Sequence, residues 1–113
     1  MDKLEVGMYA RHKKGICKID GFASTIYDDY ITDEKGSMAL IDEILKTSHN
    51  IIDLIEEGDY VNGVLVESIY SREENKMLFH TFETEIMMEI TNENINNIVT
   101  KEQFLNIAYR IGD

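Results

Sequence analysis

The chain has 113 residues, of which 43% are hydrophobic, and a formal net charge of −11 at pH 7. This length supports one hydrophobic core but not two ordinary domains, and the apolar fraction is typical of a folded chain. Proline is absent and only seven residues are glycine, so no proline-rich or glycine-rich linker divides the sequence. We therefore expect a single domain over residues 1–113.

The charge is distributed unevenly along the chain. Residues 1–20 contain five basic and three acidic residues, whereas residues 21–113 contain six basic and nineteen acidic residues. A mainly acidic surface repels phosphate, so direct nucleic-acid binding is disfavoured. The acidic residues either keep the protein soluble or attract basic proteins by imitating nucleic acid, and the sequence leaves both interpretations open.

Cysteine usage and the first residues argue against several further classes of protein. Cys17 is the only cysteine, which excludes an internal disulfide and a cysteine-based structural zinc site. Residues 1–5 lack the basic and apolar regions of a signal peptide, and no apolar run is long enough to span a membrane. We expect a cytoplasmic protein without membrane association, metal ion or other cofactor.

Short alternating segments dominate the first half of the chain. Residues 4–11 alternate between apolar and polar, which predicts a half-buried strand with Arg11 on its exposed face. A polar turn at residues 12–15 and a returning strand at 16–19 complete a predicted hairpin. Further strands are predicted at 26–32 and 37–41, joined by a turn at 33–36.

The middle of the chain contains both helix and strand signals. Residues 50–57 begin with a capping asparagine and predict a short helix or 3₁₀ turn, although a strand within 44–55 is the alternative. Strand signals follow at 59–61, 64–69, 77–82 and 86–90, and helix competes with strand at 83–90. The Asn62-Gly63 pair predicts a hairpin turn, because both residues accept positive φ.

The C-terminal segment contains a capping box, Thr100 to Gln103, which predicts one or two helical turns near residues 100–106. Phe104 is expected to face the core from this turn, and Ile107, Tyr109 and Ile111 to share one face of a terminal strand. Together these patterns predict a mainly β fold with one or two short helical segments, arranged as a small antiparallel SH3-like or Tudor-like barrel or a curled sheet.

No known catalytic pattern accounts for the chemically active residues. The acidic cluster around Asp33 lacks the spacing of a calcium loop, and the three histidines lack the spacing of a metal site. Cys17 could act as a nucleophile only with a histidine base nearby in space, and although its neighbour Lys18 could lower the pKa of the thiol, a single thiol in an apolar strand is more often part of the core. Phosphate-binding and nucleophile-elbow motifs are absent. We therefore expect no enzymatic activity.

Two segments are candidate contact surfaces for another protein. The first combines tyrosines with acids, a composition suited to interface anchors and to pairing with basic residues. It consists of Tyr27, Asp28, Asp29, Tyr30, Asp33 and Glu34. The second is the only basic cluster, which would suit an acidic partner. It consists of Arg11, His12, Lys13 and Lys14.

Three segments carry a family resemblance, namely residues 4–11, 50–63 and 95–104. In this order and spacing, and most sharply in the ending Ile98 to Phe104, the chain resembles a family of small uncharacterised proteins from bacteriophages, prophages and mobile elements of Gram-positive bacteria. The resemblance covers nearly the whole chain and implies a β-rich, phage-related protein, but it implies no catalytic residue.

A weaker similarity concerns residues 4–22, which resemble the start of the Tudor-like module of CarD-type regulators. Met8 and Lys14 depart from the pattern of that module, so this similarity supports only the barrel. The leading hypothesis is a binding protein that contacts another protein, such as a host factor. The alternative is a structural or assembly role in a phage particle or in a self-associating homo-oligomer.

Overall fold

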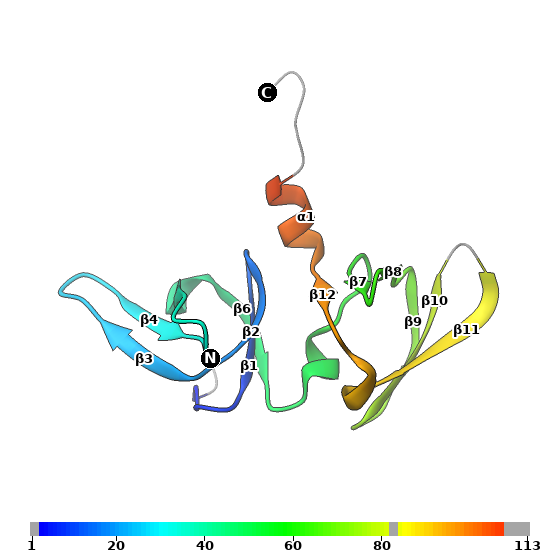
Figure 1. Ribbon diagram of the computed structural model, residues 1–113, viewed down its shortest axis with the longest axis horizontal. Helices are drawn as coiled ribbons and strands as arrows, with labels where there is room; N and C mark the ends of the chain where they lie inside the picture. Colours follow the sequence, from blue (N-terminus) through cyan, green and yellow to red (C-terminus); the bar gives the residue numbers. More distant parts are fainter. Residues whose placement is uncertain (1–2, 82–83, 108–113) are drawn as a thin grey trace, which may run out of the picture.

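A computed structural model describes residues 3–81 and 84–107 of the chain. The molecule is mainly β and elongated, with extents of 52 × 42 × 24 Å. Its radius of gyration is 15.3 Å, whereas a compact chain of this length would have about 13 Å. Figure 1 shows the cause: two β-rich halves lie side by side along the long axis, and the short C-terminal helix projects between them.

Two three-stranded antiparallel sheets form the N-terminal half. The central sheet has the strand order β2-β1-β6, and the outer sheet has the order β3-β4-β5. The bounds are β1 Tyr9–His12, β2 Gly15–Lys18, β3 Gly21–Ser24, β4 Asp29–Thr32, β5 Met38–Leu40 and β6 Ile44–Ser48. The 3₁₀ turn η1, Ile41–Glu43, joins β5 to β6.

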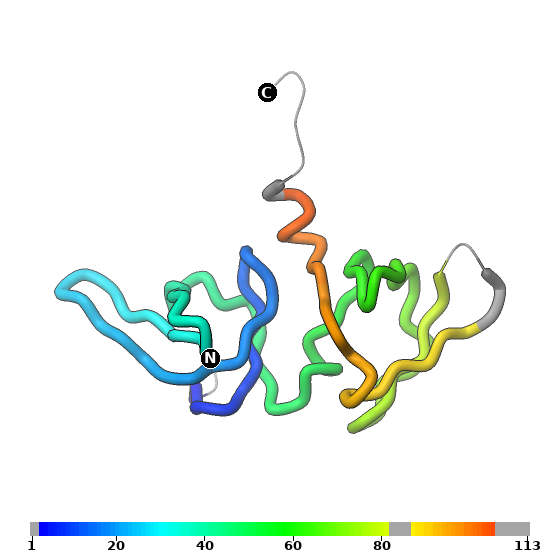
Figure 2. Tube along the Cα trace, viewed as in Figure 1, coloured from blue at the N-terminus to red at the C-terminus, as the bar shows by residue number. Residues whose placement is uncertain are grey.

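Two further three-stranded antiparallel sheets form the C-terminal half, with orders β12-β7-β8 and β11-β10-β9. Their bounds are β7 Tyr60–Val61, β8 Val64–Leu65, β9 Ser68–Arg72, β10 Lys76–Thr81, β11 Thr84–Thr91 and β12 Ile98–Val99. Two 3₁₀ turns, η2 at Ile51–Leu54 and η3 at Asn92–Asn94, precede β7 and β12, and the helix α1 spans Lys101–Ile107. Figure 2 shows the chain passing through β12 back between the two halves before it enters α1.

The buried apolar side chains form two clusters rather than one. The N-terminal cluster contains Met8, Ala10, Ile19, Ile31 and Ile44. The C-terminal cluster contains Ile52, Ile55, Val61, Val66, Met77, Phe79 and Ile90. Each half therefore stabilises its own sheets by burying its own apolar cluster.

The strand β1 belongs to the N-terminal half, lies at its border with the C-terminal half and is buried on both faces. Its register places Ala10 opposite Cys17 and Arg11 opposite Ile16. Ala10 belongs to the N-terminal core, while the neighbouring Arg11 points the other way and has an exposed fraction of 0%. The prediction that this strand is only half-buried, with Arg11 on an exposed face, is therefore wrong.

The predicted turns are confirmed where local chemistry determines them. Lys13 and Lys14 form the two-residue turn between β1 and β2. Asn62 and Gly63 have φ values of 51° and 81°, which is the left-handed conformation required by a tight hairpin. At 44–55 both alternatives occur in succession, as β6 and η2, and at 84–91 the strand β11 prevails over helix. The predicted cap at Asn50 is wrong, because its side chain makes no capping hydrogen bond to η2.

The mainly β prediction with short helical segments is confirmed, but none of the four sheets closes into a barrel. A closed barrel would need one continuous sheet, whereas the described strands pair only in groups of three. The strand β3 was not predicted. Ile107 lies in α1, and the remainder of the predicted terminal strand lies outside the described residues.

Candidate binding surfaces

The first candidate surface is centred on the tip of the β3–β4 hairpin, which extends away from the body of the molecule (Figure 1). The side chain of Thr25 fixes the turn, because its Oγ1 accepts hydrogen bonds from the N–H groups of Tyr27 and Asp28 at 3.2 and 3.0 Å. Ile26 and Tyr27 have exposed fractions of 89% and 85%. The tip thus presents two large apolar side chains beside the exposed acids Asp28 and Asp29.

The structure divides the six predicted residues of this surface. Tyr27, Asp28 and Asp29 lie at the tip and the half-buried Tyr30 follows in β4, whereas Asp33 and Glu34 lie in the turn after β4, at a distance of roughly 13 Å for a four-residue strand. Asp33 also has a local role, since its Oδ1 accepts hydrogen bonds from the N–H groups of Lys35 and Ser37, both at 2.9 Å. The turn after β4 therefore belongs to a different surface.

The second candidate surface, the basic cluster at residues 11–14, does not include Arg11. Arg11 is buried, whereas Lys13 and Lys14 remain exposed at the β1–β2 turn. His12 is half-buried, and its Nδ1 accepts a hydrogen bond of 3.2 Å from the N–H of Lys14. The exposed basic tip is therefore smaller than predicted.

Arg11 instead makes the most extensive polar contact between the halves. Its Nη1 and Nη2 donate to the two carboxylate oxygens of Asp59, at 2.5 and 2.8 Å. Its Nε and Nη2 donate to the two carboxylate oxygens of Glu102, at 2.8 and 2.9 Å, and Nη1 also donates to the carbonyl of Leu54 at 2.8 Å. All five N–H donors of the guanidinium group are thus used.

Asp59 accepts further hydrogen bonds within the same network. Its carboxylate accepts the backbone N–H of Glu56 at 2.7 Å and that of Lys101 at 3.0 Å. Burial alone lowers the pKa of Arg11, but the hydrogen bonds to Asp59 and Glu102, together with the negative charges of Asp59 and Glu56, outweigh burial and raise this pKa above its ordinary value. The guanidinium group therefore remains charged and connects β1, the segment before β7, and α1.

The capping box at the start of α1 is confirmed. The N–H of Thr100 donates to Gln103 Oε1 at 3.0 Å, and the N–H of Gln103 donates to Thr100 Oγ1 at 3.1 Å. Gln103 also covers Gly15, where an added Cβ would lie 2.7 Å from the Gln103 side chain. The helix therefore docks through its polar first turn.

Phe104 lies on the opposite side of this helix, so the prediction that it faces the core is wrong. It has an exposed fraction of 53%, and its ring stacks on Tyr60 with a centroid distance of 6.1 Å. Because Glu102 and Gln103 occupy the docked side of α1, the next residue along the helix is directed toward solvent.

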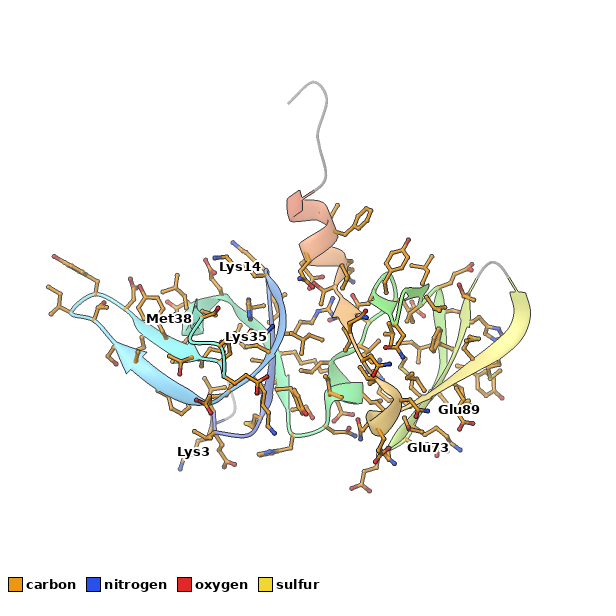
Figure 3. The ribbon with its side chains drawn as sticks, viewed as in Figure 1. Lys3, Lys14, Lys35, Met38, Glu73 and Glu89 are labelled. Carbon is orange, nitrogen blue, oxygen red and sulfur yellow. The ribbon has the colours of Figure 1, made fainter. Side chains whose placement is uncertain are left out.

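A groove of about 460 Å³ lies between the two halves in front of β2, a size typical of ligand pockets. The structure brings Asp33 and Glu34 to this groove together with Cys17, which sequence analysis did not connect with them. Burial and the nearby Asp33 raise the pKa of the Cys17 thiol. Figure 3 shows Lys14 and Lys35 beside β2, while Glu73 and Glu89 lie on the C-terminal half.

The described part of the chain has neither a metal-binding cluster nor a membrane-spanning helix. Within residues 3–81 and 84–107 no group of three or more His, Cys, Asp or Glu residues is placed to hold a metal ion. No helix in this part of the chain is both long enough and apolar enough to cross a membrane.

Comparisons with known proteins found no matching family model, no matching curated protein and no matching solved structure.

Proposed function

We propose that the chain is a small acidic binding protein of the bacteriophage or mobile-element type, which acts by contact with another protein and not by catalysis. The observation that carries this proposal is the hairpin tip, where Ile26 and Tyr27 are almost fully exposed next to Asp28 and Asp29. Large apolar side chains that remain in water are unfavourable for a monomer, and tyrosine is a common anchor residue of interfaces.

The chemistry of the tip favours a basic partner with an apolar pocket. The two aspartates would pair with lysine or arginine, while the whole chain, with a net charge of −11, would attract such a surface over a longer distance. The turn that presents the two apolar side chains is already fixed by Thr25. Little conformational entropy would therefore be lost when the tip enters a pocket.

The test is affinity capture from a Gram-positive bacterial lysate with three forms of the protein. The wild type is compared with the double variant Ile26→Ser/Tyr27→Ser and with Tyr70→Ser, which alters another exposed tyrosine, on β9. We expect a protein that the wild type and Tyr70→Ser retain and that the double variant loses. Equal recovery with all three forms, or no specific recovery, would contradict the proposal.

An assembly role is the second candidate function, because the exposed Phe104–Tyr60 stack adds apolar surface next to the edge strand β12. This role predicts homo-oligomers that Phe104→Ser disrupts. Sedimentation of both forms over a range of concentrations distinguishes it from the leading proposal.

A further inference from the structure

The edge of β2 that faces the groove has free backbone hydrogen-bonding groups. β2 is an end strand of its sheet, and no other described strand pairs with it on that side. The N–H of Ile19 donates to the carbonyl of Met8 at 2.8 Å, and bonded residues alternate along an antiparallel pair. The N–H and C=O groups of Ile16 and Lys18 are therefore directed away from β1.

The two walls of the groove differ in chemistry. Ile16 lies on the same face of its sheet as Arg11, toward the C-terminal half, whereas Cys17 packs against the N-terminal core. The wall of the C-terminal side contains three isoleucines, Ile51, Ile95 and Ile98, together with the polar Asn96 and Asn97. The wall of the N-terminal side is charged and contains Asp33, Glu34 and Lys35.

A strand placed beside β2 would direct alternate side chains toward these two walls. The charged wall has two acids and one lysine, and Asp33 acts on the Cys17 thiol as a negative charge. A lysine or arginine side chain is therefore complementary to this wall, and an aliphatic side chain is complementary to the other.

We propose that the groove binds an extended segment of a partner protein by strand addition to β2, with apolar residues toward Ile95 and Ile98 and basic residues toward Asp33 and Glu34. This surface is independent of the hairpin tip. Gln103 covers β2 at Gly15, which limits the added strand to about four residues, or roughly 13 Å. The acidic tip of a second copy does not fit, because Asp28 and Asp29 would meet Asp33 and Glu34.

The test uses a displayed library of random peptides of about eight residues, selected on the intact protein. We expect enriched peptides to alternate between aliphatic and basic residues. Hydrogen exchange with a selected peptide should slow at the amides of Ile16 and Lys18, which point into the groove. The amide of Cys17 should change little, because it already faces β1.

Two matched pairs of variants locate the binding site. Lys18→Pro removes an outward N–H that an edge strand can lose without disturbing its ladder, whereas Lys18→Ala keeps it. We expect the proline variant alone to bind roughly tenfold more weakly, the effect of one lost hydrogen bond. Glu34→Lys should also weaken binding, while Glu67→Lys, an exposed site in the other half, should not.

Several results would overturn the proposal. These are enriched peptides without the alternation, equal binding to Lys18→Pro and Lys18→Ala, protection at amides outside the groove, or no peptide enriched above an unrelated control protein. Dimerisation that Lys18→Pro abolishes would also overturn it, since a second copy would then occupy the groove. Thermal unfolding of each variant confirms that it is folded before binding is compared.

Discussion

Arg11 and Asp59 form a doubly hydrogen-bonded ion pair in which both side chains are fully buried, 48 residues apart in the sequence. Each residue belongs to a different half of the molecule, and neither half shares its apolar core with the other. Glu102 adds the helix α1 to the same network. The relative position of the halves, and hence the groove between them, therefore depends on this buried pair.

The first prediction is that Arg11→Leu lowers the free energy of unfolding by about 3–5 kcal/mol, because Asp59 is left as an unpaired buried charge. Arg11→Lys should also destabilise, since an ammonium group cannot reproduce five donors in a plane. Lys14→Ala, at the exposed end of the same hairpin, should change stability by less than about 0.5 kcal/mol. Urea unfolding measures all three, and a small effect of Arg11→Leu would show that the network is dispensable.

The second prediction corrects an expectation from the sequence. Phe104→Ala should cost only about 0.5–1.5 kcal/mol, the contribution of an aromatic pair, because the ring is half-exposed and stacks on Tyr60. Phe79→Ala, in the C-terminal core, should cost about 3–5 kcal/mol. Urea unfolding of both variants gives the comparison, and equal losses would mean that Phe104 is buried in solution.

The turns and the buried Arg11 show which features the sequence could predict and which it could not. The capping box at Thr100 and the turn at Asn62-Gly63 depend on neighbouring residues, so local patterns located them correctly. The burial of Arg11 depends on partners 43 to 91 residues away. An arginine within an alternating strand does not reveal such partners.

The candidate surfaces were likewise predictable only in part. The composition of residues 27–30 identified the hairpin tip, but the separation of Asp33 and Glu34 from it follows from the length of β4. The groove could not be predicted without knowing how the two halves are placed, because residues that line it, such as Ile16 and Ile98, are distant in sequence. The unclosed sheets, which leave β2 as an edge, were likewise not predictable from strand patterns alone.

The third prediction concerns pH and His12, whose pKa is lowered by burial and by Lys14, although Glu43 and Asp33 oppose the shift. The unfolded chain therefore binds this proton more readily than the folded chain. The stability from neutral His12 is fully present above the ordinary histidine pKa of about 6.5 and is lost as the pH falls through the folded-state pKa. Protonation would also remove the Nδ1 acceptor of the Lys14 N–H.

The measurement is the urea midpoint of wild type and His12→Gln between about pH 7.5 and about pH 5.5. The wild type should lose more stability than the variant over this range. If the two curves are parallel, His12 has no role in the pH dependence.

The last prediction concerns Cys17, the only cysteine of the chain and one of the residues that line the groove. Burial and Asp33 raise the pKa of its thiol, so less thiolate is present near neutral pH than in an unfolded chain. Iodoacetamide should therefore alkylate the folded protein more slowly than the urea-unfolded protein, as followed by mass spectrometry. Asp33→Asn should partly restore the rate, because it removes the negative charge, and Cys17→Ser should cost roughly 1 kcal/mol of stability. Alkylation that is faster in the folded state would instead identify an activated thiol, and would make the groove a candidate catalytic site rather than a binding site.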